Sequence, residues 1–465
     1  MFLALQGTTL PEQFGAVLVL EPRDTFDVRL AMEALRERAC AVPRLRQRVM
    51  RAPPGCGRPV WVDDADFRAE RHVEHVVCPP PGDEAALLDV AARLVTRPLA
   101  LDRPLWSAAV VTGLALGRVA LIVVIQHALA DGIGGLAVLG VLVDGAPVPP
   151  PPAFPMPPPS AGELAADAFR SRIRRLSSGS RKIRAVAKAP HAPRIGRAFP
   201  CSLLRPTGPR RRVTIARAAL DDVRAVAHQH GATVNDVLLT AIGGALHTTL
   251  EQRGEDLPAV IAGIPVTDRR SATTQTLGNR FHEVRVAIPG GGEPLERLER
   301  VAGTMRVRKR SGRGPAGPVA SALVRAAIAV GVYEWYMRRQ RYLHTVVTNV
   351  PGPGSRHTFC GAPIVEMLPL AVGGGGNVTV TYAALSYAGT LAVSVTADPE
   401  RVPDLACTTA ALQAELDRLT AHARPGPGRP NVPTAGQRPT PPVAFGPVGR
   451  VVAEGGLEQT VRTRR

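Results

Sequence analysis

A proline-rich run at residues 147–160, PVPPPPAFPMPPPS, restricts the fold more than any other segment of the sequence. Nine of its fourteen residues are proline, which lacks a backbone N–H and fixes φ at about −65°. Such a segment can continue neither a helix nor an inner β-strand, so we expect an extended linker here. The chain must therefore fold as two blocks, one on each side of this run.

We expect four segments along the 465 residues of the chain. Residues 1–146 and 201–423 each alternate helical and strand-like hydrophobic patterns, which predicts two mixed α/β domains. Residues 147–200 combine the proline-rich run with an arginine-rich stretch at 170–197 that is predicted to be helical, and they connect the two domains. Residues 424–465 are rich in Pro, Gly and Arg, and we expect this tail to be disordered.

Lys and Arg total 57 against 39 Asp and Glu, a formal net charge of +18 that favours anionic partners. Aromatic residues make up only 4% of the chain and no nucleic-acid-binding module is recognisable, so we expect no nucleic-acid partner. A phosphate-bearing ligand or an anionic membrane surface remains, and an arginine-biased composition explains the charge equally well. Trp335 and Tyr336, beside Arg338 and Arg339, form one candidate interfacial anchor, with core packing as the alternative.

The cysteine pattern and the apolar stretches bear on location. Six scattered cysteines without CxxC spacing are typical of reduced thiols in a cytoplasmic protein. No secretion signal is recognisable, and the apolar stretches at 119–125 and 319–333 are too short or too interrupted to cross a bilayer, which takes about 20 apolar residues. We expect a cytoplasmic protein, either soluble or attached to the inner face of a membrane. His72 and His75 flank Glu74, but no third ligand is evident, and we expect no metal site.

Residues 119–135, VALIVVIQHALADGIGG, carry the candidate chemistry. The apolar stretch predicts a strand buried on both faces that ends in Gln126 and His127, and a short turn then leads to Asp131 and Gly132. A histidine held at a strand end suits a general base, because its ordinary pKa lies near neutrality. Asp131 is expected to fix the turn rather than to take part in catalysis. By itself, the pattern also fits a purely structural histidine.

This segment resembles the HHxxxDG motif of the bacterial wax ester synthase/diacylglycerol acyltransferase family, within the CoA-dependent acyltransferase superfamily. Other short segments across residues 14–420 match further motifs of the family in the expected order. They are Pro104-Leu105-Trp106, Asn235-Asp236, Gly278-Asn279, Asn349-Val350-Pro351-Gly352 and Thr396-Ala397-Asp398. Each motif is weak alone, and their shared order makes the resemblance specific. One position departs from it, since Gln126 stands where the family has its first histidine.

The resemblance implies an α/β (α+β) fold of two chloramphenicol-acetyltransferase-like domains joined by the proline-rich crossover. It also implies an O-acyltransferase that moves a long-chain fatty acyl group from acyl-CoA to diacylglycerol or a fatty alcohol, forming triacylglycerol or wax ester. Acyl-CoA is then a substrate, a lipid alcohol is the acceptor, and no cofactor is needed. An anionic membrane or lipid-droplet surface is a further expected partner. Two alternatives stay open, namely another hydroxyl acceptor on the same fold and an inactive acyl-CoA- or lipid-binding protein, which Gln126 motivates.

Roles for single residues follow from the resemblance alone. His127 is the expected general base, and it acts directly on the acceptor hydroxyl without an acyl-enzyme. Asn279 is a candidate hydrogen-bond donor to the tetrahedral oxyanion. Other residues are implied as motif or structural supports (Gln126, Asp131, Gly132, Asn235, Asp236) and as packing beneath the site along the substrate channel (Pro104, Leu105, Trp106).

Overall fold

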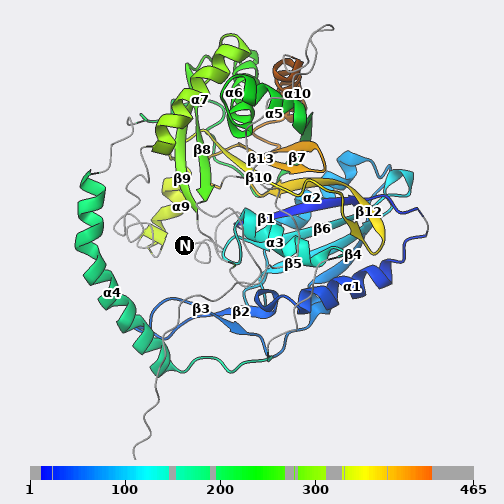
Figure 1. Cartoon of the computed structure of the whole chain (residues 1–465), viewed down its shortest axis with the longest axis vertical. Helices are drawn as coiled ribbons and strands as arrows, with labels where there is room; N and C mark the ends of the chain where they lie inside the picture. The colour runs from blue at the N-terminus through cyan, green and yellow to red at the C-terminus, as the bar shows by residue number, and fades with distance from the viewer. Residues whose placement is uncertain are drawn as a thin grey trace, which may run out of the picture.

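The computed structural model describes residues 12–23, 25–145, 153–188, 195–267, 277, 281–310, 327–328, 330–373 and 375–421. These residues form two six-stranded sheets with helices against them, and the long helix α4 (Ala161–Lys188) lies at the periphery of the molecule (Figure 1). The tail at 424–465, predicted to be disordered, lies outside the described residues, as do Gly278 and Asn279. The predicted mixed α/β fold is confirmed.

The first sheet has the strand order β11-β12-β1-β6-β5-β4. Its strands are β1 (Gln13–Leu20), β4 (Val73–Val77), β5 (Trp106–Thr112), β6 (Val119–Gln126), β11 (Thr358–Phe359) and β12 (Ala362–Ala371). Three helices, α1 (Val28–Cys40), α2 (Glu84–Thr96) and α3 (Gly132–Leu142), accompany it, with the small hairpin of β2 (Gln47–Met50) and β3 (Val60–Asp63). The central strand β6 is buried at every position, as its continuous apolar sequence predicted.

The second sheet has the order β7-β14-β13-β10-β8-β9. Its strands are β7 (Arg212–Ala219), β8 (Ala259–Thr267), β9 (Phe281–Pro289), β10 (Thr345–Pro351), β13 (Val380–Tyr387) and β14 (Thr390–Ala397). The helices of this half are α5 (Leu220–Gln229), α6 (Val234–Gln252), α7 (Pro294–Arg310), α9 (Val332–Met337) and α10 (Leu405–Ala421). The start of α6 carries a reciprocal cap, with Thr233 accepting from the Asp236 amide and Asp236 from the Thr233 amide.

The second half of the chain contributes two strands to the first sheet. β12 lies in the sequence between β10 and β13 of the second sheet, yet it pairs antiparallel with β1, and β11 pairs with it. The first sheet therefore contains two strands from residues 201–423, which the sequence assigned to the C-terminal domain. Because β12 hydrogen-bonds to β1, the second half of the chain helps to build the sheet that holds His127.

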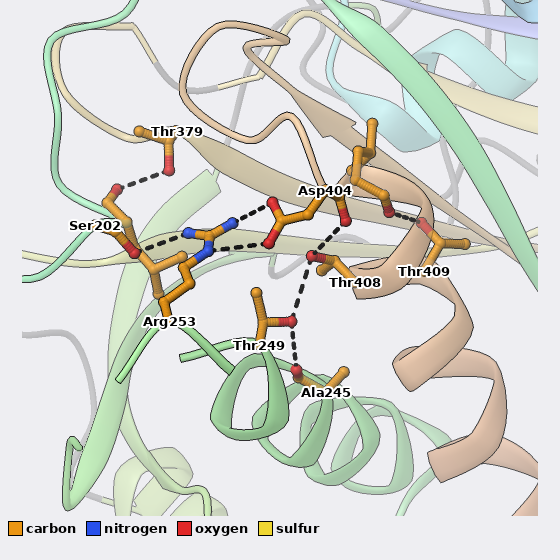
Figure 2. A network of polar contacts seen from close by, with 10 residues as sticks. Ser202, Ala245, Thr249, Arg253, Thr379, Asp404, Thr408 and Thr409 are labelled. Atoms are coloured by element: carbon orange, nitrogen blue, oxygen red, sulfur yellow. Dashed lines mark hydrogen bonds and ion pairs between the residues drawn. The ribbon is translucent and has the colours of Figure 1, made fainter. Parts of the chain in front are cut away.

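A polar network ties the helices of the second half together (Figure 2). Arg253, at the end of α6, donates from Nε and Nη2 to the two carboxylate oxygens of Asp404 at 3.1 and 2.6 Å, and from Nη1 to Ser202 Oγ at 2.8 Å. Thr249 Oγ1 lies 3.3 Å from Thr408 Oγ1, which links α6 to α10 directly. Paired planar hydrogen bonds of this kind fix orientation as well as distance. The network gives α10 and α6 a fixed relative position.

Candidate active site

His127 follows the last residue of β6 and extends the pairing of β6 with β1. Gln13 is opposite Gln126 in the register, and the His127 amide donates to the Glu12 carbonyl at 2.9 Å. The side chains of β6 alternate between two cores, and His127 lies on the face of Ile125, where its ring meets the Phe14 ring at a centroid distance of 4.6 Å. The central sheet thus fixes the imidazole from the backbone and from one side.

The glycine-rich start of α3 closes against this ring. Asp131 caps the helix, accepting from the Gly134 amide at 2.9 Å, which satisfies one of the open N–H groups of the first turn. A Cβ at Gly135 would lie 2.6 Å from Phe14 Cε2, and one at Gly132 would lie 2.8 Å from Val350 Cγ2. Only glycine lets α3 approach so closely. Val350 belongs to the segment at 349–352, so the structure brings that motif to the turn between β6 and α3, which carries His127 and is the candidate catalytic turn.

Burial governs the electrostatics of His127. It lowers the pKa of the imidazole to about 4, against the opposing effects of the Asp131 carboxylate and of a hydrogen bond to the Ala130 backbone. The ring is therefore neutral at pH 7, as a general base must be before the reaction. Once the ring gains a proton, the Asp131 carboxylate and the Ala130 backbone stabilise the cation.

Gln126 lies on the opposite face of the sheet from His127. Its side chain is fully buried on the face of Val124 and Ile122, and its Oε1 accepts from the Ala128 amide. The departure from the family pattern therefore sits beneath the turn and not beside the imidazole. A neutral histidine accepting through one ring nitrogen could make the same bond to the amide.

Glu12 is a backbone neighbour of His127 that the sequence analysis missed. Its backbone faces His127 across the sheet, and burial raises the pKa of its carboxyl to about 7. Burial, then the charges of Glu12 and Glu283, raise the pKa of Tyr333 on α9 to about 12, which places both carboxyls near that phenol. The signal that could have found Glu12 is the register of β1 against β6, and a single sequence does not give that register.

The remaining predicted residues divide into two groups. Leu105 and Trp106 lie directly beneath the site, since the Leu105 carbonyl accepts from the Gln126 amide at 3.1 Å and Trp106 pairs with Ile125 on β6. Trp106 is 2% exposed, and its indole donates to the Leu45 carbonyl at 2.8 Å, so its ring belongs to the core. Asn235 and Asp236, by contrast, start α6, whose contacts are with α5, α7, α10, β8 and β9 of the second half.

Pro104 is buried next to Leu105, and the border of a substrate channel stays a prediction for this segment. The histidines around Glu74 have separate protein partners. His72 stacks on Trp106 with ring centroids 4.7 Å apart, and His75 bonds to Thr112 Oγ1 at 2.8 Å. Within the described residues, histidine, cysteine and carboxylate side chains nowhere gather in threes as a metal ion would require.

Comparison with known proteins decides which family this site belongs to. Residues 1–238 match the wax ester synthase/diacylglycerol acyltransferase catalytic domain, and residues 277–420 match the C-terminal domain of the same family. The chain belongs to this family. It is 30% identical over 443 residues to a protein of Mycobacterium tuberculosis named as a probable diacylglycerol O-acyltransferase, covering 88% of this chain and 91% of that relative. The family membership that the motifs suggested is confirmed, and the chain is an acyltransferase of this family.

Solved structures agree on the fold of this acyltransferase. The wax ester synthase/diacylglycerol acyltransferase of Marinobacter aquaeolei superposes with a TM-score of 0.65 at 21% identity, over 91% of this chain and 97% of that one. A condensation domain of the calcium-dependent antibiotic synthetase superposes with a TM-score of 0.56 at 20% identity, over 90% and 94%. None of the helices in the described part of the acyltransferase is long and apolar enough to span a membrane.

Proposed function

We propose that the chain transfers a long-chain fatty acyl group from acyl-CoA to the hydroxyl of diacylglycerol or of a fatty alcohol, with His127 as general base. The observation that carries the proposal is the neutral imidazole held at the end of β6, beside the capped start of α3, in a chain of this family. The relatives named as diacylglycerol O-acyltransferases supply the acceptor class.

The chemistry needs one proton to move twice. The imidazole of His127 takes the proton of the acceptor hydroxyl as that oxygen attacks the thioester carbonyl carbon. The tetrahedral intermediate then collapses, the C–S bond breaks, and the imidazolium returns the proton to the departing thiolate, which leaves as CoA. The Asp131 carboxylate, which raises the pKa of His127, stabilises the imidazolium between these two transfers.

The oxyanion of the intermediate needs a fixed donor, and Asn279 is the residue that the family resemblance proposes. Gln126 does not argue against turnover, because its side chain lies on the far face of β6 from the base. The structure therefore favours an active enzyme over the inactive binding protein that Gln126 first suggested.

The test measures free thiol released from palmitoyl-CoA in the presence of diolein or hexadecanol. We expect wild type to release CoA only when an acceptor is present, and His127→Ala to lose about 100- to 10,000-fold of that rate. His75→Ala is the matched control, since His75 is an exposed histidine on β4. Product analysis of the wild-type reaction identifies triacylglycerol or wax ester.

Two results would contradict the proposal. A rate of CoA release that is the same with and without an acceptor alcohol would indicate a thioesterase. Acyl-CoA binding without turnover, unchanged by His127→Ala, would indicate a binding protein, and Gln126→His would then be the first substitution to examine.

We further propose that the enzyme works on the inner face of an anionic membrane or on a lipid droplet, through α4. Phe169 and Ile173, one helical turn apart, are 62% and 50% exposed, and Arg170, Arg172 and Arg174 lie beside them. Exposed apolar and basic residues on one helix suit the surface of anionic lipid. Flotation with phosphatidylglycerol vesicles tests this, and Phe169→Ser with Ile173→Ser should reduce the bound fraction severalfold, whereas unchanged flotation would exclude α4 as the anchor.

A further inference from the structure

A basic cavity of about 600 Å³ lies in the second half of the molecule, outside the catalytic turn. It is formed by residues 195–197 near the end of the linker, by β9 and by the segment 335–342 that includes the end of α9. Its volume is within the range of about 300–1,000 Å³ that is usual for small-molecule sites. Among the described residues, four arginines and no acidic residue line it: Arg197, Arg285, Arg339 and Arg341.

The protein holds several of these arginines in place. Arg285 donates to the Gly196 carbonyl at 2.8 Å, and its guanidinium lies 3.9 Å from the centre of the Tyr342 ring. Arg341 Nε donates to the Ala198 carbonyl at 2.9 Å. Arg339 lies over the Trp335 ring at 5.0 Å. The guanidinium groups are therefore oriented by backbone carbonyls and aromatic rings, which carry no net charge and do not neutralise the arginines.

The charge of the cavity is little compensated. Among the described residues, no carboxylate lies within ion-pair distance of Arg197, Arg285, Arg339 or Arg341. Glu283, which precedes Arg285 by two residues on β9, has an exposed side chain; desolvation raises the pKa of its carboxyl, and the charge of Arg285 opposes that rise. Arg338 differs from these four because it pairs with Glu334 at 3.6 Å.

Two contacts relate the surroundings of the cavity to the turn that carries His127. The Glu12 backbone pairs with that of His127, and the phenol of Tyr333 lies within electrostatic reach of both Glu12 and Glu283. Leu277, four residues before β9, meets the start of α3, where a Cβ at Gly134 would lie 3.2 Å from Leu277 Cδ2.

α9 spans the interval between the two places. Its Tyr333 phenol is close to the Glu12 carboxyl, and Tyr336, three residues further along the same helix, lines the cavity. A thioester at His127 and a phosphate group at the arginines can therefore belong to one molecule.

We propose that this cavity binds the phosphate-bearing adenosine end of coenzyme A while the thioester reaches His127. Ordered guanidinium groups pair with phosphate oxygens through two parallel hydrogen bonds, which favours arginine over lysine in such sites. Trp335 and Tyr336 are 57% and 51% exposed and offer the faces on which an adenine ring stacks. The assignment rests on the acyl-CoA substrate proposed above and adds the residues that select for its nucleotide.

The experiment measures binding of CoA, of dephospho-CoA, which lacks the 3′-phosphate, and of pantetheine to the full chain by calorimetry. We expect wild type to bind CoA more tightly than dephospho-CoA or pantetheine. Arg339→Gln should lower the affinity for CoA about tenfold and reduce the difference in affinity between CoA and dephospho-CoA. Trp335→Ala should weaken CoA and dephospho-CoA alike, with pantetheine unchanged. Arg338→Gln is the matched control, because this neighbouring arginine does not line the cavity.

Kinetic measurements of acyl transfer distinguish a failure of the proposed CoA site from a failure of the proposed function. In acyl transfer, Arg339→Gln should raise the KM for palmitoyl-CoA with little change in kcat. CoA binding that depends on Arg339, without any ester product, would support the CoA site in the cavity and refute the proposed acyltransferase function. Ester formation with the same KM and the same CoA affinity in Arg339→Gln and wild type would refute the cavity. Weaker binding to phosphatidylglycerol vesicles, with CoA affinity unchanged, would instead assign the arginines to lipid headgroups.

Discussion

His127 follows the last residue of β6, and His344 precedes the first residue of β10. Burial lowers the pKa of both imidazoles. They differ in what surrounds the ring. The Ile261 amide donates to Nδ1 of His344 at 2.9 Å, so Nε2 carries the proton and donates to the Phe199 carbonyl at 2.9 Å. His344 thus connects β8 with the end of the linker through its two ring nitrogens. His127 instead has its backbone in the sheet and its ring between Phe14, Asp131 and Ala130.

The comparison shows that burial and a low pKa do not by themselves mark a general base. A ring whose nitrogens both serve the backbone cannot change its proton without losing a structural bond. A ring positioned through its backbone and beside a carboxylate can do so. The substitutions below separate these two situations, from the largest expected effect to the smallest.

Exchanging each histidine for glutamine should give the largest contrast in activity. We expect His127→Gln to lower kcat/KM by about 100- to 10,000-fold, because the amide cannot take up the hydroxyl proton. Its urea midpoint at pH 7 should move far less than that of a His344 variant. In addition, the folded pKa of His127 lies below its ordinary value, so wild type loses stability as pH falls from about 6.5 towards 4, and His127→Gln should lose less. A fully active His127→Gln enzyme would place the base elsewhere.

The reverse pattern is expected at His344. His344→Ala leaves the buried Ile261 N–H and the partly buried Phe199 carbonyl without their partner, which should cost about 1–3 kcal/mol of unfolding free energy. The kcat per folded molecule should stay near wild type. Urea unfolding followed by circular dichroism, together with active-site titration, measures the two quantities separately. Normal stability with lost activity would make His344, and not His127, the functional ring.

The ionisation of Glu12 should change the unfolding free energy with pH in the direction opposite to that of His127. Its folded pKa of about 7 lies above the ordinary value of 4.5, so its stabilising contribution is complete below pH 4.5 and is lost as pH rises through 7. Glu12→Gln should therefore be more stable than wild type at pH 8, by on the order of 1–2 kcal/mol. Both neighbouring ionisable groups, His127 and Tyr333, are neutral at that pH.

The same variant tests whether Glu12 influences turnover. If the carboxyl affects the base, the change in kcat/KM that wild type shows near pH 7 should disappear in Glu12→Gln. Stability curves that coincide from pH 5 to pH 8 would show that the carboxyl is solvated and not part of the site.

The sequence predicted what local physics decides. The apolar run of β6, the histidine at its end and the turn fixed by Asp131 all depend on residues a few positions apart, and the structure has each of them. It could not predict what depends on distant segments. Glu12 faces His127 because of a strand register, and Arg285 meets Arg341 because β9 and a segment more than fifty positions later fold around one cavity. The pairing of β12 with β1 is hidden for the same reason.

The smallest effect is expected at Gln126, the position that departs from the family pattern. Its side chain accepts from the Ala128 amide on the face opposite His127, and a neutral histidine can accept there too. Gln126→His should therefore change kcat/KM by no more than about fivefold, equivalent to about 1 kcal/mol. Gln126→Leu, which cannot accept from the amide, should cost more, since the turn that holds the imidazole loses one of its bonds. If Gln126→His raised kcat/KM a hundredfold, a histidine at position 126 would influence His127 even though the two side chains lie on opposite faces of the sheet.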